Sequence, residues 1–68
     1  MMNQLNWEMI DMFMNDFMND VELLNIFNNH GDEPSLRDLS NDYYRYNNKY
    51  DFRLCDMAYI VSHLEATF

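Results

Sequence analysis

Asp16 and Asp20 are the first residues of this sequence whose type and spacing could do chemistry. They occupy equivalent places in the tandem repeat FMNDFMND over residues 13–20, and side chains four residues apart lie about 6 Å from each other on one row of a helix. Two neighbouring carboxylates can do acid–base chemistry only in a cleft that shifts their pKa values. A chain of 68 residues rarely encloses such a cleft, so we expect no enzymatic activity.

Other chemical groupings in the sequence are weaker. His30, Asp32 and Glu33 could ligate a metal, but the second His or Cys cluster of a zinc site and the loop pattern of an EF-hand are missing. Cys55 and His63 are eight residues apart, which is about 12 Å along a helix and too far for a nucleophile and its base. A single glycine excludes a glycine-rich phosphate loop. We expect no metal and no cofactor.

The charges are distributed unevenly along the chain. Twelve Asp and Glu residues face four Lys and Arg residues, and the formal net charge is −8. Residues 1–36 hold seven carboxylates and no Lys or Arg, which gives −7, whereas residues 37–68 hold five carboxylates and all four bases, which gives −1. Like charges one helical turn apart destabilise a helix. A cationic partner would relieve that repulsion.

This asymmetry predicts a surface that binds a positively charged partner. Carboxylates one helical turn apart repeat at a spacing of the same order as successive phosphates on a nucleic-acid strand. We therefore expect a non-enzymatic inhibitor or binding protein that engages a basic, nucleic-acid-binding surface of a host protein by charge mimicry. The predicted contact residues are Glu8, Asp11, Asp16, Asp20 and Glu22. In kind, though through no motif, the chain is similar to the small acidic inhibitors of phages and mobile elements, such as anti-restriction and anti-CRISPR proteins and polymerase inhibitors.

Two alternatives stay open. The acidic residues could serve only solubility, in a self-associating helical module such as a homodimer. Five residues lying off the main apolar stripes could then form an aromatic interface: Trp7, Tyr44, Phe52, Tyr59 and His63. A wide buried face would instead draw Phe52 and Tyr59 into the core. Direct nucleic-acid binding is not expected, because Asp residues offset the basic residues among the tyrosines.

The composition predicts an all-α protein, a small bundle of three to four short helices in one domain over residues 1–68. Apolar residues make up 49% of the chain, and one Gly and one Pro leave few helix breakers. Apolar side chains on one helical face indicate a first helix over 4–18, capped by Asn3 or Asn6. Asp20 suits the N-cap of a second helix over 21–29, with a break at 19–20. One continuous helix is the alternative.

Two further helices are expected after a helix stop at Gly31, which suits the left-handed conformation.

Pro34 is expected in the first turn of the third helix, with Ser35 and Asp38 forming a capping pattern. Spacings of three and four residues predict apolar seams in both helices, at Leu36, Leu39, Tyr43, Tyr46, Tyr50 and at Leu54, Met57, Val61, Leu64, Phe68. We expect the two helices to pack antiparallel across a turn at 47–51, with Asp51 capping the last helix.

The cellular location is predicted as cytoplasmic, in the host cytoplasm if the chain is encoded by a phage. Cys55 is the only cysteine, so no internal disulfide can form. The first four residues carry no basic group of the kind that opens a secretory signal. The longest apolar run, 57–61, falls far short of the ~20 residues that span a bilayer. Because so small a domain is marginally stable, we also expect dimerisation or docking on a partner.

Overall fold

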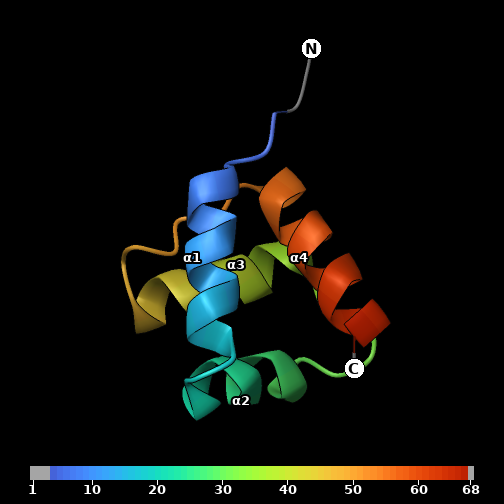
Figure 1. Cartoon of the computed structure of the whole chain (residues 1–68). Coiled ribbons are helices and arrows are strands. Elements are labelled where there is room, and N and C mark those ends of the chain that lie inside the picture. The colour runs from blue at the N-terminus through green and yellow to red at the C-terminus, as the bar shows by residue number, and fades with distance from the viewer. Residues whose placement is uncertain (1–3, 68) are drawn as a thin grey trace.

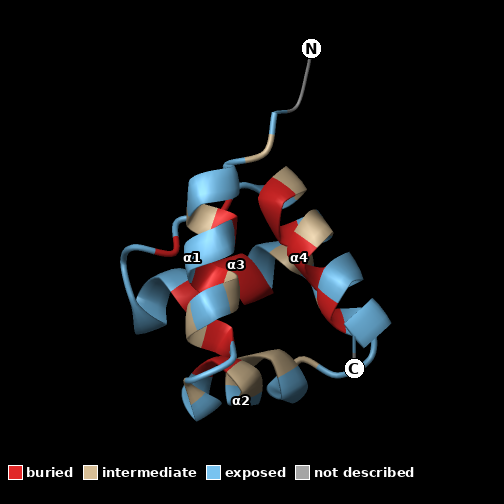
Figure 2. Cartoon of the chain, in the orientation of Figure 1, coloured by how far each residue is buried: buried red, intermediate tan, exposed pale blue. Residues whose placement is uncertain are grey.

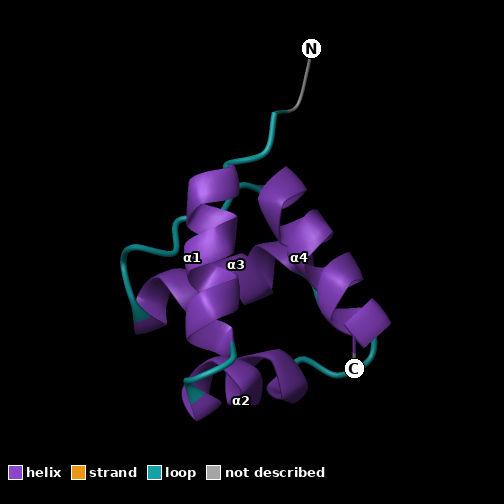
Figure 3. Ribbon diagram, viewed as in Figure 1, coloured by secondary structure: helices purple, strands orange, loops and turns teal. Residues whose placement is uncertain are grey.

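Helices dominate the part of the chain that the structure describes, residues 4–67. This computed structural model has four helices there and no strand (Figure 1). They are α1 (Trp7–Phe17), α2 (Val21–Asn29), α3 (Leu36–Tyr46) and α4 (Leu54–Thr67). Figure 3 shows that loops make all the connections between them. The predicted small all-α bundle is confirmed.

The helices surround a common centre. In Figure 1, α3 crosses behind α1, α2 lies below them, and α4 stands at the side. Figure 2 shows the buried residues on the sides of α1, α3 and α4 that face this centre. Helices α3 and α4 pack against each other as expected. Figure 1 shows them crossing each other rather than running side by side, however, so the expected antiparallel pairing is wrong.

The break between the first two helices is confirmed, and Asp20 caps the helix that follows it. Asp20 has an extended backbone (φ −122°), and its side chain accepts a hydrogen bond from the backbone N–H of Glu22 at 3.0 Å. This is the N-cap arrangement that the sequence predicts. The alternative of one continuous helix is therefore wrong. Asn6 caps α1 by accepting from the Met9 N–H, while Asn3 lies outside the described residues.

The later helix ends follow the sequence signals in part. Gly31 takes the left-handed conformation (φ 77°), and the Ser35 side chain caps α3 by accepting from the Asp38 N–H. Pro34 precedes this cap, so its expected place in the first turn is wrong. Asp51 lies three residues before α4 and does not cap it. The Asp56 carboxylate accepts from the backbone N–H next to the helix start instead.

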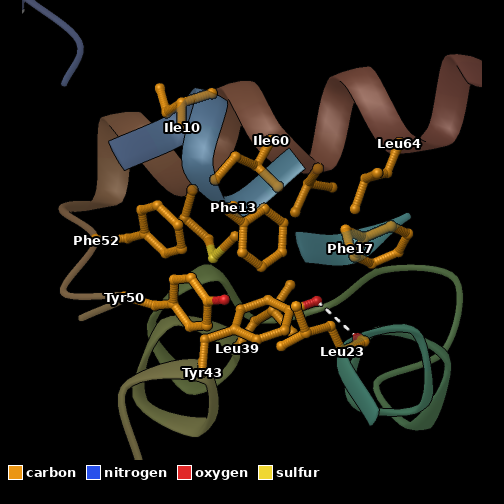
Figure 4. Close-up of a cluster of buried hydrophobic side chains, with 12 residues drawn as sticks. Ile10, Phe13, Phe17, Leu23, Leu39, Tyr43, Tyr50, Phe52, Ile60 and Leu64 are labelled. Atoms are coloured by element: carbon orange, nitrogen blue, oxygen red, sulfur yellow. Dashed lines mark hydrogen bonds between the residues drawn. The ribbon is translucent and has the colours of Figure 1, made fainter. Parts of the chain in front are cut away.

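Phe13 is the centre of the core. Its ring is fully buried and meets three other rings edge-on, with centroids 4.9 Å from Tyr43, 5.4 Å from Tyr50 and 5.3 Å from Phe52 (Figure 4). Aromatic pairs prefer this geometry because the positive edge of one ring meets the negative face of the other. Phe17, the equivalent position of the next repeat, packs on Phe13 at 5.6 Å. The repeat therefore builds the core with its Phe residues.

The predicted seams are only partly buried. Helix α3 ends at Tyr46, so Tyr50 reaches the core from the following loop. Tyr46 and Leu54 belong to the predicted seams but are 44% and 47% exposed. Ile60, absent from the predicted seam, is fully buried, and Phe68 lies outside the described residues.

A candidate acidic binding surface

The five predicted contact acids lie along α1 and at the corner where the chain turns from α1 into α2. On α1, Glu8 and Asp11 fall on the half of the helix opposite its buried Phe residues, since 3.6 residues complete a turn, and Asp16 lies at the edge of the buried face. Asp20 caps α2, and Glu22 lies in the first turn of that helix. We call these five residues the acidic strip. Glu8 and Asp16 are about 12 Å apart along α1 at 1.5 Å per residue, so the strip is extended rather than clustered.

At the corner between α1 and α2, two tyrosines bind two carboxylates of the strip. The Tyr50 hydroxyl donates to Asp16, and the Tyr46 hydroxyl donates to Asp20 at 2.7 Å. The two aspartates are four residues apart in the sequence, and so are the two tyrosines that bind them. The end of α3 and the loop after it are therefore tied to the break between α1 and α2.

A shallow hollow of about 510 Å³ opens at this corner. Asp16, Asp20, Tyr46, Lys49 and Tyr50 contribute to its lining. The Lys49 ammonium lies 3.0 Å from the Asp16 carboxylate and 5.3 Å from the centre of the Tyr50 ring. The strip is therefore partly neutralised here, and within residues 4–67 Asp16 is its one member with a cation against it.

These contacts fix the protonation states at the corner. The hydrogen bond from Tyr50 and the neighbouring Lys49 lower the pKa of Asp16 below its ordinary value. Burial and the bond to Asp16 raise the pKa of Tyr50, and the bond to Asp20 raises that of Tyr46. The carboxylate of Asp16 is thus ionised and both phenols are protonated at neutral pH. Phenols that hold their protons so firmly do not act as general bases.

The cations of the chain are mostly occupied elsewhere. Arg45 contacts Asp42 at 3.1 Å, and Arg53 contacts Asp56 at 3.2 Å. Within residues 4–67, Arg37 makes no ion pair. The three exposed acids of the strip make no ion pair within these residues either, and none of their carboxylates makes a hydrogen bond there: Glu8, Asp11 and Glu22. The negative charge at these three positions is therefore open to solvent.

Three of the five predicted interface aromatics come together at a different place. The Trp7 ring meets Tyr59 edge-on at 5.1 Å, and Tyr59 stacks on His63 at 6.0 Å, which joins the start of α1 to the outer side of α4. Trp7 is 50% exposed. Tyr44 is exposed on α3 and makes no ring contact with this group. Phe52 is buried in the core, as the alternative reading of the sequence allows.

The sequence missed the residues that organise the corner, Tyr46, Lys49 and Tyr50. The signal that could have found the two tyrosines is their spacing, which equals that of Asp16 and Asp20. His30, weighed above as a metal ligand, instead has its Nε2 2.7 Å from the Asp42 carboxylate. No group of three or more His, Cys, Asp or Glu side chains converges on a metal site between residues 4 and 67.

Comparisons with known proteins found no matching family, no similar curated protein and no similar solved structure. Among the described residues, no helix has both the length and the apolar character needed to cross a membrane.

Proposed function

We propose that this chain is a small non-enzymatic protein that binds and blocks a basic, nucleic-acid-binding surface of a host protein. The acidic strip supplies the contact, and its carboxylates take the place of nucleic-acid phosphates. The proposed setting is the cytoplasm of a cell invaded by a phage or mobile element, where small acidic inhibitors of nucleic-acid enzymes act.

The observation that supports this proposal best is the pairing of the cations. Three of the four already contact carboxylates of the chain itself, so they do not neutralise Glu8, Asp11 and Glu22. Unscreened charge of one sign raises the rate of encounter with a surface of the opposite sign, and added salt weakens the attraction. A chain with a net charge of −8 gains affinity for a basic groove in this way without any apolar pocket.

The proposal is tested by neutralising the open acids and leaving the structural ones in place. Glu8→Gln, Asp11→Asn and Glu22→Gln together change the net charge from −8 to −5 without touching the Asp16 and Asp20 contacts. Immobilised wild type is expected to capture a basic protein from a bacterial lysate at low salt and to release it to excess duplex DNA. The triple variant is expected to lose this capture.

The matched control neutralises three exposed acids outside the strip, through Asp32→Asn, Glu33→Gln and Asp51→Asn. It reaches the same net charge of −5 and should retain the capture. Equal losses in both triple variants would show that net charge alone drives binding, and that the strip is not the contact surface. Captured protein that duplex DNA cannot displace would contradict mimicry.

A further inference from the structure

The outer side of α4 differs from the rest of the surface, because it carries almost no charge. Of the two carboxylates on this 14-residue helix, Asp56 is buried and paired with Arg53, and only Glu65 is exposed. The other exposed positions are apolar or small and neutral, apart from His63: Leu54, Ala58, Ser62, Ala66 and Thr67. Because the outer side of α4 carries so little charge, covering it with a second protein surface costs little in lost hydration of charged groups.

The geometry of this side suits close packing against another helix. Leu54, Ala58 and Ser62 are spaced by four residues, so they form one row along the helix. Small side chains in such a row let two helix axes approach each other. The Trp7–Tyr59–His63 group borders the row on the α1 side, and the half-exposed Trp7 alone offers on the order of 100 Å² of aromatic surface. The row and its border form what we call the α4 face.

We propose that the α4 face binds a second copy of this chain through a two-fold axis. Copies that each carry a net charge of −8 repel each other, so they can associate only through a face that is nearly free of carboxylates. The α4 face meets this condition, whereas the acidic strip does not. A two-fold pairing also lets the same patch serve both partners.

The remaining charges of the α4 face fit an antiparallel pairing of the two helices. Glu65 lies near the end of α4, and Arg53, 57% exposed, lies just before its start. Antiparallel α4 helices bring each Glu65 toward the Arg53 end of the other copy, where the helix dipole is also positive. A parallel pairing would instead place the two Glu65 carboxylates side by side.

The area required is compatible with the size of the molecule. A specific interface buries at least about 1,000 Å² in total, so each copy must contribute about 500 Å² of its 4613 Å² surface, which is roughly one ninth. One face of a 14-residue helix, about 21 Å long, with an adjoining tryptophan, covers a share of that order. The interface is at the small end of the range, so we expect a concentration-dependent dimer.

Sedimentation equilibrium of the full chain tests the proposal. The wild type is expected to approach twice its mass of 8.3 kDa as its concentration rises, and dimerisation should strengthen with salt because repulsion between the copies is screened. Fluorescence of the single tryptophan should shift to the blue over the same concentration range, as Trp7 becomes covered. Ala58→Glu should remain monomeric, with its helical circular dichroism unchanged.

Asn25→Glu on the exposed side of α2 is the matched control, because it adds the same charge away from the α4 face. It should dimerise almost as the wild type does. A wild type that stays monomeric at high concentration and high salt would overturn the proposal, as would an Ala58→Glu variant that dimerises normally. The proposed function is separable from this result, since capture of a basic partner weakens with salt and involves Glu8, Asp11 and Glu22.

Discussion

The Asp56 carboxylate accepts a hydrogen bond from the backbone N–H of Asn6 at 3.0 Å, across 50 positions of the chain. Asp56 is 1% exposed and also accepts from the Arg53 backbone N–H. The Arg53 guanidinium contacts Asp56 and donates to the Gln4 carbonyl. One buried carboxylate therefore joins the segment before α1 to the start of α4.

Replacing this carboxylate should be costly. Asp56→Ala leaves two backbone N–H groups without acceptors and removes the partner of Arg53, so we expect the free energy of unfolding to fall by about 3 kcal/mol. Urea titration followed by circular dichroism measures the change. The control is Asp51→Ala, an exposed acid just before α4, which should stay within about 0.5 kcal/mol of the wild type. Similar losses in the two variants would show that the buried contacts contribute little.

Acid should destabilise the fold through two carboxylates. Burial alone would raise the pKa of Asp56, but the bonds from Arg53 and from the Asn6 N–H outweigh it and hold the pKa below its ordinary value. The pKa of Asp16 is lowered as well. Such groups stabilise the fold fully above their unfolded pKa, about 4, and lose this contribution as the pH falls through the folded value.

Urea midpoints measured from neutral pH downwards should therefore decrease below about pH 4. The double variant Asp16→Asn, Asp56→Asn is expected to be less stable at neutral pH and to show a flatter decline in acid. A variant profile as steep as that of the wild type would assign the acid sensitivity to other groups.

Phe13 should be the least replaceable side chain of the core, because three other rings meet its edge or face. Phe13→Ala should cost about 4 kcal/mol, which is close to the whole stability of a small domain. Phe13→Leu keeps part of the volume and should leave a folded protein with a lower melting temperature. Met12→Ala, at the exposed neighbouring position, should melt almost as the wild type does. Equal melting temperatures for Phe13→Leu and Met12→Ala would contradict the central role of this ring.

Tyr43 should make the fold sensitive to alkali. Its hydroxyl donates to the Leu23 carbonyl at 3.2 Å, and burial raises its pKa above the ordinary value of 10.0. A raised pKa gives stability that is complete below the unfolded value and is lost as the pH rises above it. Tyr43→Phe should therefore lose about 1 kcal/mol at neutral pH but decline less between about pH 9 and about pH 11. Thermal melts at both ends of this range compare the two proteins, and parallel declines would contradict the assignment.

The local signals of the sequence predicted much of the fold. Asp20 and Ser35 mark helix starts because each side chain accepts a hydrogen bond from a backbone N–H two or three residues later. Gly31 marks a helix end through its own left-handed backbone conformation. The helical periodicity of the apolar residues also predicted that Phe13 and Phe17 lie on one buried face. These features depend on neighbours in the chain, which a sequence displays directly.

The contacts between distant segments were not predictable in the same way. The bond of the Asp56 carboxylate to the Asn6 N–H has no signal in the sequence, because the two residues are 50 positions apart. Helical periodicity left open whether Phe52 belongs to an interface or to the core, because Phe52 precedes the start of α4, where that periodicity does not apply. The acidic strip was predicted from charge alone, and the tyrosines that bind Asp16 and Asp20 come from another part of the chain.

Helix α2 has one fully buried side chain, Leu23, whereas α1, α3 and α4 have several each. Segments with little buried apolar surface open locally at lower free energy than the rest of a molecule. The acidic strip thus runs from α1, which has three buried side chains, onto α2, which has one and whose Leu24, Ile26 and Phe27 are only partly buried. Under the proposed function, Glu22 at the far end would adjust to the contour of a bound surface, while Asp20, which the Tyr46 hydroxyl holds, and the end on α1 would keep their shape.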